Sequence, residues 1–194
     1  MQTSRQFLSA ILLLSLLISG SYAKASDFKL WEVIKSESNI VLIVRHAEIS
    51  GRNPTQFDPS GNCQGESMLT PKGRQDASAI AQTFRANGVA VTSLEVVSSA
   101  MCRTRDTAML AFGKAQLDPD LREFFSGSPE QMNRAMDAAE KWIKQLRGQR
   151  PVILVTHLPN IDALTGEQPN YNQMLVTRSE SNGQLEVIGK VKLY

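Results

Sequence analysis

Three short apolar runs constrain the fold of this chain more than any other feature of its sequence. Residues 40–44 and 152–155 are unbroken runs of Val, Ile and Leu, and residues 94–97 form a weaker run that Glu95 interrupts. Runs of this length without polar alternation are typical of strands that are buried on both faces of a sheet. We therefore expect parallel strands in these three places.

Segments with helical periodicity separate the runs. Thr70 is a typical N-cap with Pro71 at the first helical position, and apolar residues follow at spacings of three and four until Gly88. A second helix is predicted to begin at Ser128-Pro129 and to end at Gly148, and a third over residues 101–112. Alternating strands and helices indicate an α/β fold, a three-layer sandwich with a mainly parallel central sheet flanked by helices.

The end of the chain has a different pattern. Residues 174–179 and 185–193 are β-like and flank Asn182-Gly183, a strong hairpin signal, so an antiparallel element is expected near the C-terminus. Residues 51–65 are rich in Gly, Pro, Asn and Ser and are predicted to form one long loop.

Residues 1–23 are predicted to be a secretory signal peptide, followed by a single domain over residues 24–194. Arg5 supplies the positive charge, residues 7–18 are nearly all apolar, and small residues precede a cleavage point after Ala23, with a second possible cut after Ala25. A membrane span takes about 20 apolar residues. We therefore expect a periplasmic or secreted protein with no stable membrane anchor after cleavage.

Charge and cysteine content exclude several classes of partner and site. Lys plus Arg is 21 and Asp plus Glu is 19, so the balance of +2 gives no reason to expect nucleic acid as a partner. Cys63 and Cys102 lack the spacing of a zinc site. In an exported protein they either pair or remain as two buried thiols, and the sequence leaves both possibilities open.

The chain has two histidines, and each directly follows an apolar run. His46 follows the first run and Arg45, and His157 follows the last. In open α/β sheets, ligands bind outside the carboxyl ends of the strands, where both rings would emerge. Arg103, soon after the middle run, can reach the same edge. Two guanidinium groups suit an oxyanion such as phosphate and would repel a metal cation.

Two other kinds of site fit these residues less well than a phosphate site. A metal centre would use the histidines with the nearby Glu48, but the positive charge of Arg45 would repel a metal cation. A serine hydrolase would use Ser98 or Ser99, but the chain lacks the Gly-x-Ser-x-Gly turn that exposes such a nucleophile.

Five motifs, in order along the chain, make the sequence resemble the histidine phosphatase superfamily, which has the phosphoglycerate-mutase-like fold. They are Arg45-His46-Ala47-Glu48, Leu69-Thr70-Pro71-Lys72-Gly73, the segment from Ser98 to Ala108 that contains Arg103, Leu121-Arg122-Glu123 with Gly127, and Val155-Thr156-His157.

The resemblance implies a role for each matching residue. His46 would be the nucleophile, Arg45 and Arg103 would bind the phosphoryl group with His157, and Glu123 would be the proton donor. Ala47 departs from the family, which usually has Gly there. Arg52 or Asn53 would supply a further substrate contact, and the sequence does not choose between them. No cofactor and no metal are implied.

The function implied is that of an exported, metal-independent phosphomonoesterase that forms a phosphohistidine on a small phosphorylated substrate. Small exported members of the family resemble phosphatases of cell-envelope sugar phosphates, such as lipopolysaccharide core heptose. A mutase fits less well, because export separates the protein from glycolytic intermediates. The alternative is a module that binds a phosphorylated ligand without turnover.

Overall fold

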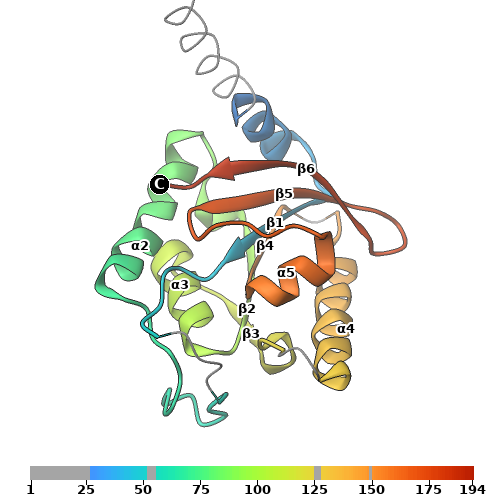
Figure 1. Ribbon diagram of the computed structural model, residues 1–194. Helices are drawn as coiled ribbons and strands as arrows, with labels where there is room; N and C mark the ends of the chain where they lie inside the picture. The colour runs from blue at the N-terminus through green and yellow to red at the C-terminus, as the bar shows by residue number, and fades with distance from the viewer. Residues whose placement is uncertain (1–26, 52–55, 125–127, 149) are drawn as a thin grey trace, which may run out of the picture.

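The central sheet has four parallel strands. The computed structural model describes residues 27–51, 56–124, 128–148 and 150–194. Strands β1 (Ile40–Arg45), β2 (Glu95–Ser99), β3 (Gln116–Asp118) and β4 (Val152–Thr156) are all parallel where they pair (Figure 1). The three apolar runs thus form strands as predicted. The short edge strand β3 was not predicted, because its three residues are polar or exposed.

Two further strands extend the sheet in the opposite sense. Strands β5 (Gln173–Ser179) and β6 (Leu185–Lys192) form an antiparallel hairpin, and β5 pairs with β1 antiparallel. The strand order across the sheet is β3-β2-β4-β1-β5-β6. The predicted antiparallel element near the C-terminus is therefore confirmed, and β4 and β1 lie at the centre of the sheet.

Helices cover both faces of the sheet and make the three layers. Helices α2 (Pro71–Ala86) and α3 (Cys102–Phe112) pack on one face, and α4 (Pro129–Leu146) and α5 (Leu158–Thr165) on the other (Figure 1). Residues 27–36 are also helical and join the first face. Two short 3₁₀ turns, at Val91–Ser93 and Pro119–Leu121, complete the described elements. The three-layer α/β architecture is as expected.

Strand β1 shows how the sheet carries two cores. Leu42 and Val44 face the core beneath α2 and α3, whereas Val41 and Ile43 face the core beneath α4 and α5. All four side chains are at most 2% exposed. Each large apolar side chain buried in this way stabilises the fold by about 1.5–3 kcal/mol relative to full exposure. The sheet is therefore packed on both faces, which fixes the positions of the residues at the ends of its strands.

The start of α2 is fixed close to the end of β1. The Thr70 side chain accepts a hydrogen bond of 2.9 Å from the backbone N–H of Gly73, as its N-cap role predicts. A side chain at Gly73 would overlap the carbonyl oxygen of Glu48. The glycine of this motif is thus required by close packing of the helix against the segment that follows His46.

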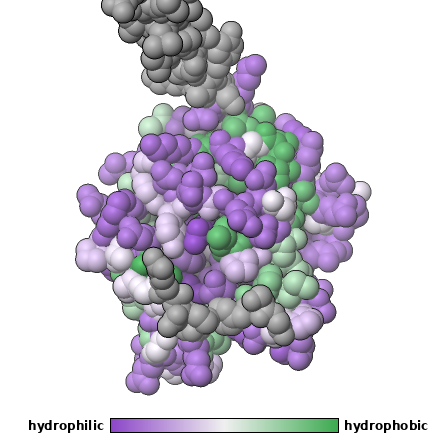
Figure 2. All heavy atoms as spheres, in the orientation of Figure 1, coloured by the Kyte–Doolittle hydropathy of each residue, from purple (hydrophilic) through white to green (hydrophobic). Residues whose placement is uncertain are grey.

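The molecular surface on the face shown in Figure 2 is mainly hydrophilic, with a hydrophobic area in its upper right part. None of the described helices combines the length and apolar character that crossing a membrane requires. The predicted signal peptide lies outside the described residues, so export remains a prediction.

Candidate active site

The register of the sheet brings the two histidines together. Arg45 at the end of β1 is opposite Thr156 at the end of β4, and each is followed by a histidine. The ring centroids of His46 and His157 are 5.5 Å apart. Both side chains are buried, at 3% and 0% exposure. The two imidazoles therefore occupy one site at the carboxyl edge of the sheet, as the sequence predicted.

His46 is held by the backbone of its own loop. Its Nδ1 lies 2.9 Å from the carbonyl oxygen of Ala47. Because a carbonyl oxygen only accepts, Nδ1 carries the proton, which leaves the lone pair of the neutral ring on Nε2. Burial, together with the charges of Arg103 and Arg45, lowers the pKa of His46 to about 3. The ring is therefore neutral at physiological pH.

His157 is held by a side chain of the neighbouring strand β2. Its Nε2 lies 2.9 Å from the hydroxyl oxygen of Ser99. Its Nδ1 is buried and has no hydrogen-bond partner among the described residues. Burial, followed by the charge of Arg103, lowers the pKa of His157 well below its ordinary value. This ring is also neutral at physiological pH.

Arg45 lies on the β5 side of the site, where an aromatic ring supports it. Its guanidinium carbon is 4.0 Å from the ring centroid of Tyr171, and Nη1 donates to the carbonyl oxygen of Pro169 at 3.5 Å. The Tyr171 ring is also 5.7 Å from the ring of His46. Burial lowers the pKa of Arg45 from its ordinary high value, but an arginine keeps its charge in proteins.

Arg103 is the second residue of α3 and is almost fully buried, with 2% of its side chain exposed. Its Nη2 lies 2.5 Å from the Oε2 of Glu123, and the carboxylate is 19% exposed. The structure thus brings Arg45, His46, Arg103, Glu123 and His157 into one region. The Glu123 carboxylate contacts Arg103 within this region.

The first turn of α3 is tied to the loop before α2 in three ways. Cys63 and Cys102 form a disulfide, which settles the question that the sequence left open. The backbone N–H of Cys102 donates to the Glu66 carboxylate at 2.7 Å, and a negative charge at a helix N-terminus is stabilising. Arg105 donates to the Gly61 carbonyl oxygen at 3.0 Å. These ties fix the start of the helix that carries Arg103.

Ala47 fits its place without backbone strain. Among the described residues Cys63 is the one residue other than glycine with a positive φ, so Ala47 does not need the conformational freedom of the usual glycine. The N–H of Ala47 donates to the Thr107 hydroxyl at 3.0 Å, and that hydroxyl donates to the Arg103 carbonyl at 2.7 Å. The loop that follows His46 and the helix that carries Arg103 are thus joined through Thr107.

Three residues near the site were missed by the sequence analysis as parts of it. Ser99 belongs to the Ser98–Ala108 motif, but the one role considered for it was that of a hydrolase nucleophile, and it is fully buried against His157. Thr107 belongs to the same motif but was given no role, and Tyr171 lies in none of the five motifs. The predicted substrate contacts Arg52 and Asn53 lie outside the described residues. No three metal-ligating side chains of the described ranges come together as a group that could hold a metal ion.

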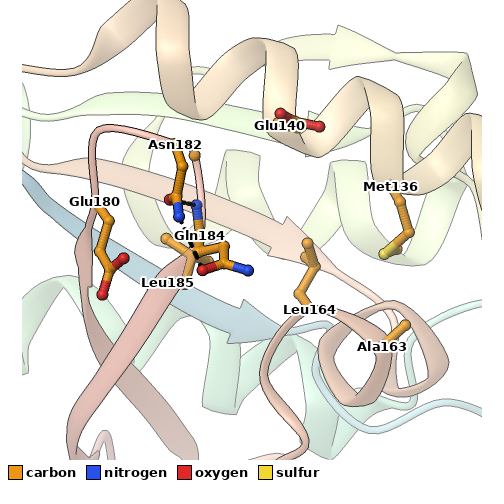
Figure 3. Close-up of a pocket in the computed structure, with 9 residues that line it drawn as sticks. Met136, Glu140, Ala163, Leu164, Glu180, Asn182, Gln184 and Leu185 are labelled. Carbon is orange, nitrogen blue, oxygen red and sulfur yellow. Dashed lines mark hydrogen bonds between the residues drawn. The ribbon is translucent and has the colours of Figure 1, made fainter.

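A separate hollow of about 590 Å³ lies between the β5–β6 hairpin and helices α4 and α5 (Figure 3). It contains neither histidine nor either arginine of the site. Its lining combines apolar side chains with amides and carboxylates, among them Met136, Glu140, Leu164, Glu180, Asn182 and Leu185.

Comparison with known proteins agrees with the fold and with the site motifs. A model of the histidine phosphatase superfamily, branch 1, matches residues 41–151. This match includes His46, Arg103 and Glu123 and ends before His157. No curated protein matches the chain.

Several solved structures have the same fold at low sequence identity. The protein of the Mycobacterium tuberculosis open reading frame Rv3214 has a TM-score of 0.59 at 19% identity, over 81% of this chain and 98% of that one. The protein histidine phosphatase SixA, complexed with tungstate, has a TM-score of 0.53 at 15% identity, over 79% and 96%. A mycobacterial glucosyl-3-phosphoglycerate phosphatase, complexed with inorganic phosphate, has a TM-score of 0.52 at 16% identity, over 80% and 97%.

Proposed function

The chain belongs to the histidine phosphatase superfamily, and on that basis we propose that it is an exported phosphatase that hydrolyses phosphate monoesters through a phosphohistidine on His46. The observation that carries this proposal is the arrangement of the two neutral imidazoles. The His46 proton is fixed on Nδ1 by the Ala47 carbonyl, and its Nε2 lone pair shares a buried site with two guanidinium groups and His157.

In the first step, Nε2 of His46 forms a bond to phosphorus while the bond from phosphorus to the ester oxygen breaks. Arg45 and Arg103 stabilise the charge on the three equatorial oxygens, and His157 adds a neutral donor. Protonated Glu123 gives its proton to the departing alkoxide. In the second step, the Glu123 carboxylate takes a proton from water, the resulting hydroxide bonds to phosphorus, and the phosphorus–nitrogen bond breaks to release phosphate.

No metal is required in this scheme, because the two arginines provide the positive charge that a metal ion would otherwise supply. Arginine donates two parallel hydrogen bonds to adjacent oxygens and remains charged when it is buried. The bond from Arg103 to Glu123 means that the arginine is shared between the carboxylate and the phosphoryl group. Ester binding would therefore loosen this ion pair and release Glu123 for proton transfer.

We propose a small sugar phosphate of the cell envelope as the substrate and the periplasm as the location. The Cys63–Cys102 disulfide supports export, since disulfides persist in oxidising compartments. Structures with this fold include a protein histidine phosphatase and a glucosyl-3-phosphoglycerate phosphatase. The fold therefore accommodates both protein and sugar-derived substrates, and the proposal of a sugar phosphate depends on the resemblance to small exported members.

The second candidate is a module that binds a phosphorylated ligand without turnover. The ion pair between Glu123 and Arg103 favours it, because the carboxylate contacts a guanidinium instead of being free to act on a leaving group. In that case Arg45, Arg103 and His157 would still hold a phosphate.

The purified protein should be assayed with a chromogenic phosphate ester over a range of pH, with and without EDTA. We expect phosphate release that EDTA does not reduce, and a labelled phosphohistidine on rapid quenching. Loss of activity with EDTA would contradict metal independence, and saturable phosphate binding without release would favour the binding module. A panel of envelope sugar phosphates, phospholipids and phosphopeptides then tests the substrate class.

A further inference from the structure

Ser99 lies between two partners in the interior of the site. It is the last residue of β2 and is fully buried. Its hydroxyl oxygen is 3.3 Å from the backbone nitrogen of Met101 and 2.9 Å from Nε2 of His157. Since the Met101 N–H donates, the hydroxyl oxygen accepts that bond, and the hydroxyl hydrogen remains to be placed.

Counting donors and acceptors decides where that hydrogen goes. Among the described residues, His157 Nε2 is the one acceptor recorded for the Ser99 hydroxyl. If the hydroxyl donates to Nε2, the ring proton sits on Nδ1 and one buried group, the Nδ1–H, is left unpaired. If Nε2 instead carries the proton and donates, both the hydroxyl hydrogen and the Nδ1 lone pair are left unpaired. The first arrangement leaves fewer buried polar groups unsatisfied.

We propose that Ser99 is a positioning residue that fixes His157 in the Nδ1–H tautomer, so that the unpaired N–H serves as a hydrogen-bond donor to a phosphoryl oxygen. The role of the donor rests on the proposed function, whereas the tautomer follows from the hydrogen bonds alone. In the opposite tautomer the unpaired Nδ1 of His157 would carry a lone pair, which repels an anion.

The tautomer matters because the ring stays neutral. A doubly protonated imidazole would donate from both nitrogens whatever Ser99 did. Burial and the nearby charge of Arg103 lower the pKa of His157 well below its ordinary value, so a second proton is not available at physiological pH. A neutral ring has one N–H, and Ser99 determines which nitrogen bears it.

The test compares Ser99→Ala with Ser98→Ala. Ser98 is the preceding residue of β2 and is equally buried, but its hydroxyl donates to the Ser99 carbonyl at 2.9 Å instead of to His157. Because the chain has two histidines, ¹⁵N-histidine labelling followed by long-range ¹H–¹⁵N NMR reads both tautomers directly. We expect Nδ1–H for both rings in the unaltered protein and in Ser98→Ala.

In Ser99→Ala we expect His157 to lose its single Nδ1–H state while His46 keeps its own. The dissociation constant for inorganic phosphate, measured by calorimetry, should rise about tenfold in Ser99→Ala and less than twofold in Ser98→Ala. Ser99→Thr keeps the hydroxyl and should restore both the tautomer and the affinity.

A Nε2–H signal for His157 in the unaltered protein would overturn the inference without any variant, even if Ser99→Ala failed to fold. Unchanged tautomer and affinity in Ser99→Ala would also overturn it, and ester hydrolysis by the unaltered protein would then still stand. Failure of the proposed function is distinct, because it shows as no hydrolysis and no phosphohistidine, whereas the tautomer signal needs no turnover.

Discussion

His46 and His157 occupy equivalent positions at the ends of neighbouring parallel strands, but opposite kinds of partner hold their rings. A backbone carbonyl accepts from Nδ1 of His46, whereas a serine hydroxyl lies against Nε2 of His157. We infer that Nδ1 carries the proton in both rings. Among the described residues, the nitrogen without a partner is Nε2 in His46, which carries a lone pair, and Nδ1 in His157, which carries a hydrogen. In the proposed mechanism the partner, rather than the histidine or its strand, thus decides whether the ring attacks phosphorus or donates to a phosphoryl oxygen.

The largest effects should come from removing each ring in turn. We expect His46→Ala to lower kcat by about 10⁴-fold or more and to abolish the phosphohistidine. For His157→Ala we expect a loss of about 10²–10³-fold, the usual effect of removing one donor to a developing charge, with the phosphohistidine still formed. Rapid-quench labelling and steady-state assays measure both. Equal losses of labelling in the two variants would contradict the different roles proposed for the two histidines.

Glu123→Gln tests whether Glu123, rather than either histidine, gives the proton to the departing alkoxide. In that case both histidine rings keep their Nδ1 protons throughout the reaction. We expect kcat for esters with poor leaving groups to fall by about 10²–10⁴-fold, while inorganic phosphate still binds. An ester with a good leaving group should be less affected in the first step. Unchanged turnover on every ester would remove Glu123 from the mechanism and return the proton to one of the histidines.

The pH dependence of stability tests whether both rings are neutral in the native state. For each histidine the native pKa lies below the ordinary 6.5, reaching about 3 for His46. The unfolded chain therefore binds protons first as the pH falls, so this stability is complete above pH 6.5 and is lost below it, for His46 down to about pH 3. At pH 5 the loss is about 2 kcal/mol for His46, and the loss for His157 has the same sign.

Urea unfolding at pH 7 and pH 5 measures this difference. His46→Gln should reduce the loss of unfolding free energy between the two pH values by about 2 kcal/mol, and His157→Gln should reduce it as well. If His157→Gln had the same pH dependence as the unaltered protein, His157 would not be a buried neutral ring, and the two histidines would differ in charge as well as in partner.

Tyr171→Leu should give the smallest effect and should act on the His46 side alone. The Tyr171 ring lies against Arg45 and near His46. Loss of the cation–π contact, worth about 1 kcal/mol, should weaken inorganic phosphate binding roughly fivefold. The NMR signals of His157 should not move. A shift of His157 rather than His46 would show that the two halves of the site are coupled through Arg45.

The sequence was sufficient to predict the parts of the fold that local patterns determine. Strands buried on both faces need apolar runs, and helices such as α2 need the cap and the proline that Thr70 and Pro71 supply. These patterns placed both histidines at strand ends, and the structure brings the two rings together at the carboxyl edge of the sheet. Strand β3 and helix α5 were missed because they are short and carry little apolar periodicity.

The finer structure of the site depends on contacts that no local pattern records. Ser99 and His157 are 58 residues apart, and only the order of β2 beside β4 brings them together. Tyr171 reaches Arg45 from a loop with no recognisable motif. The His46 contact with Ala47 differs, because adjacent residues make it and any residue at position 47 would offer the same carbonyl. The sequence alone therefore could not predict the contacts between residues that lie far apart in the chain.

The link between Cys63 and Cys102 also changes the connectivity of the chain. It closes a covalent ring, with a sequence separation of 39 residues, that includes α2 and β2. A protease that nicks the backbone anywhere within this ring would leave one covalently continuous molecule, with Arg103 still attached to both fragments through its neighbour Cys102. For a cut within this ring, the bond must also be reduced before the fragment that bears His46 separates from the fragment that bears His157.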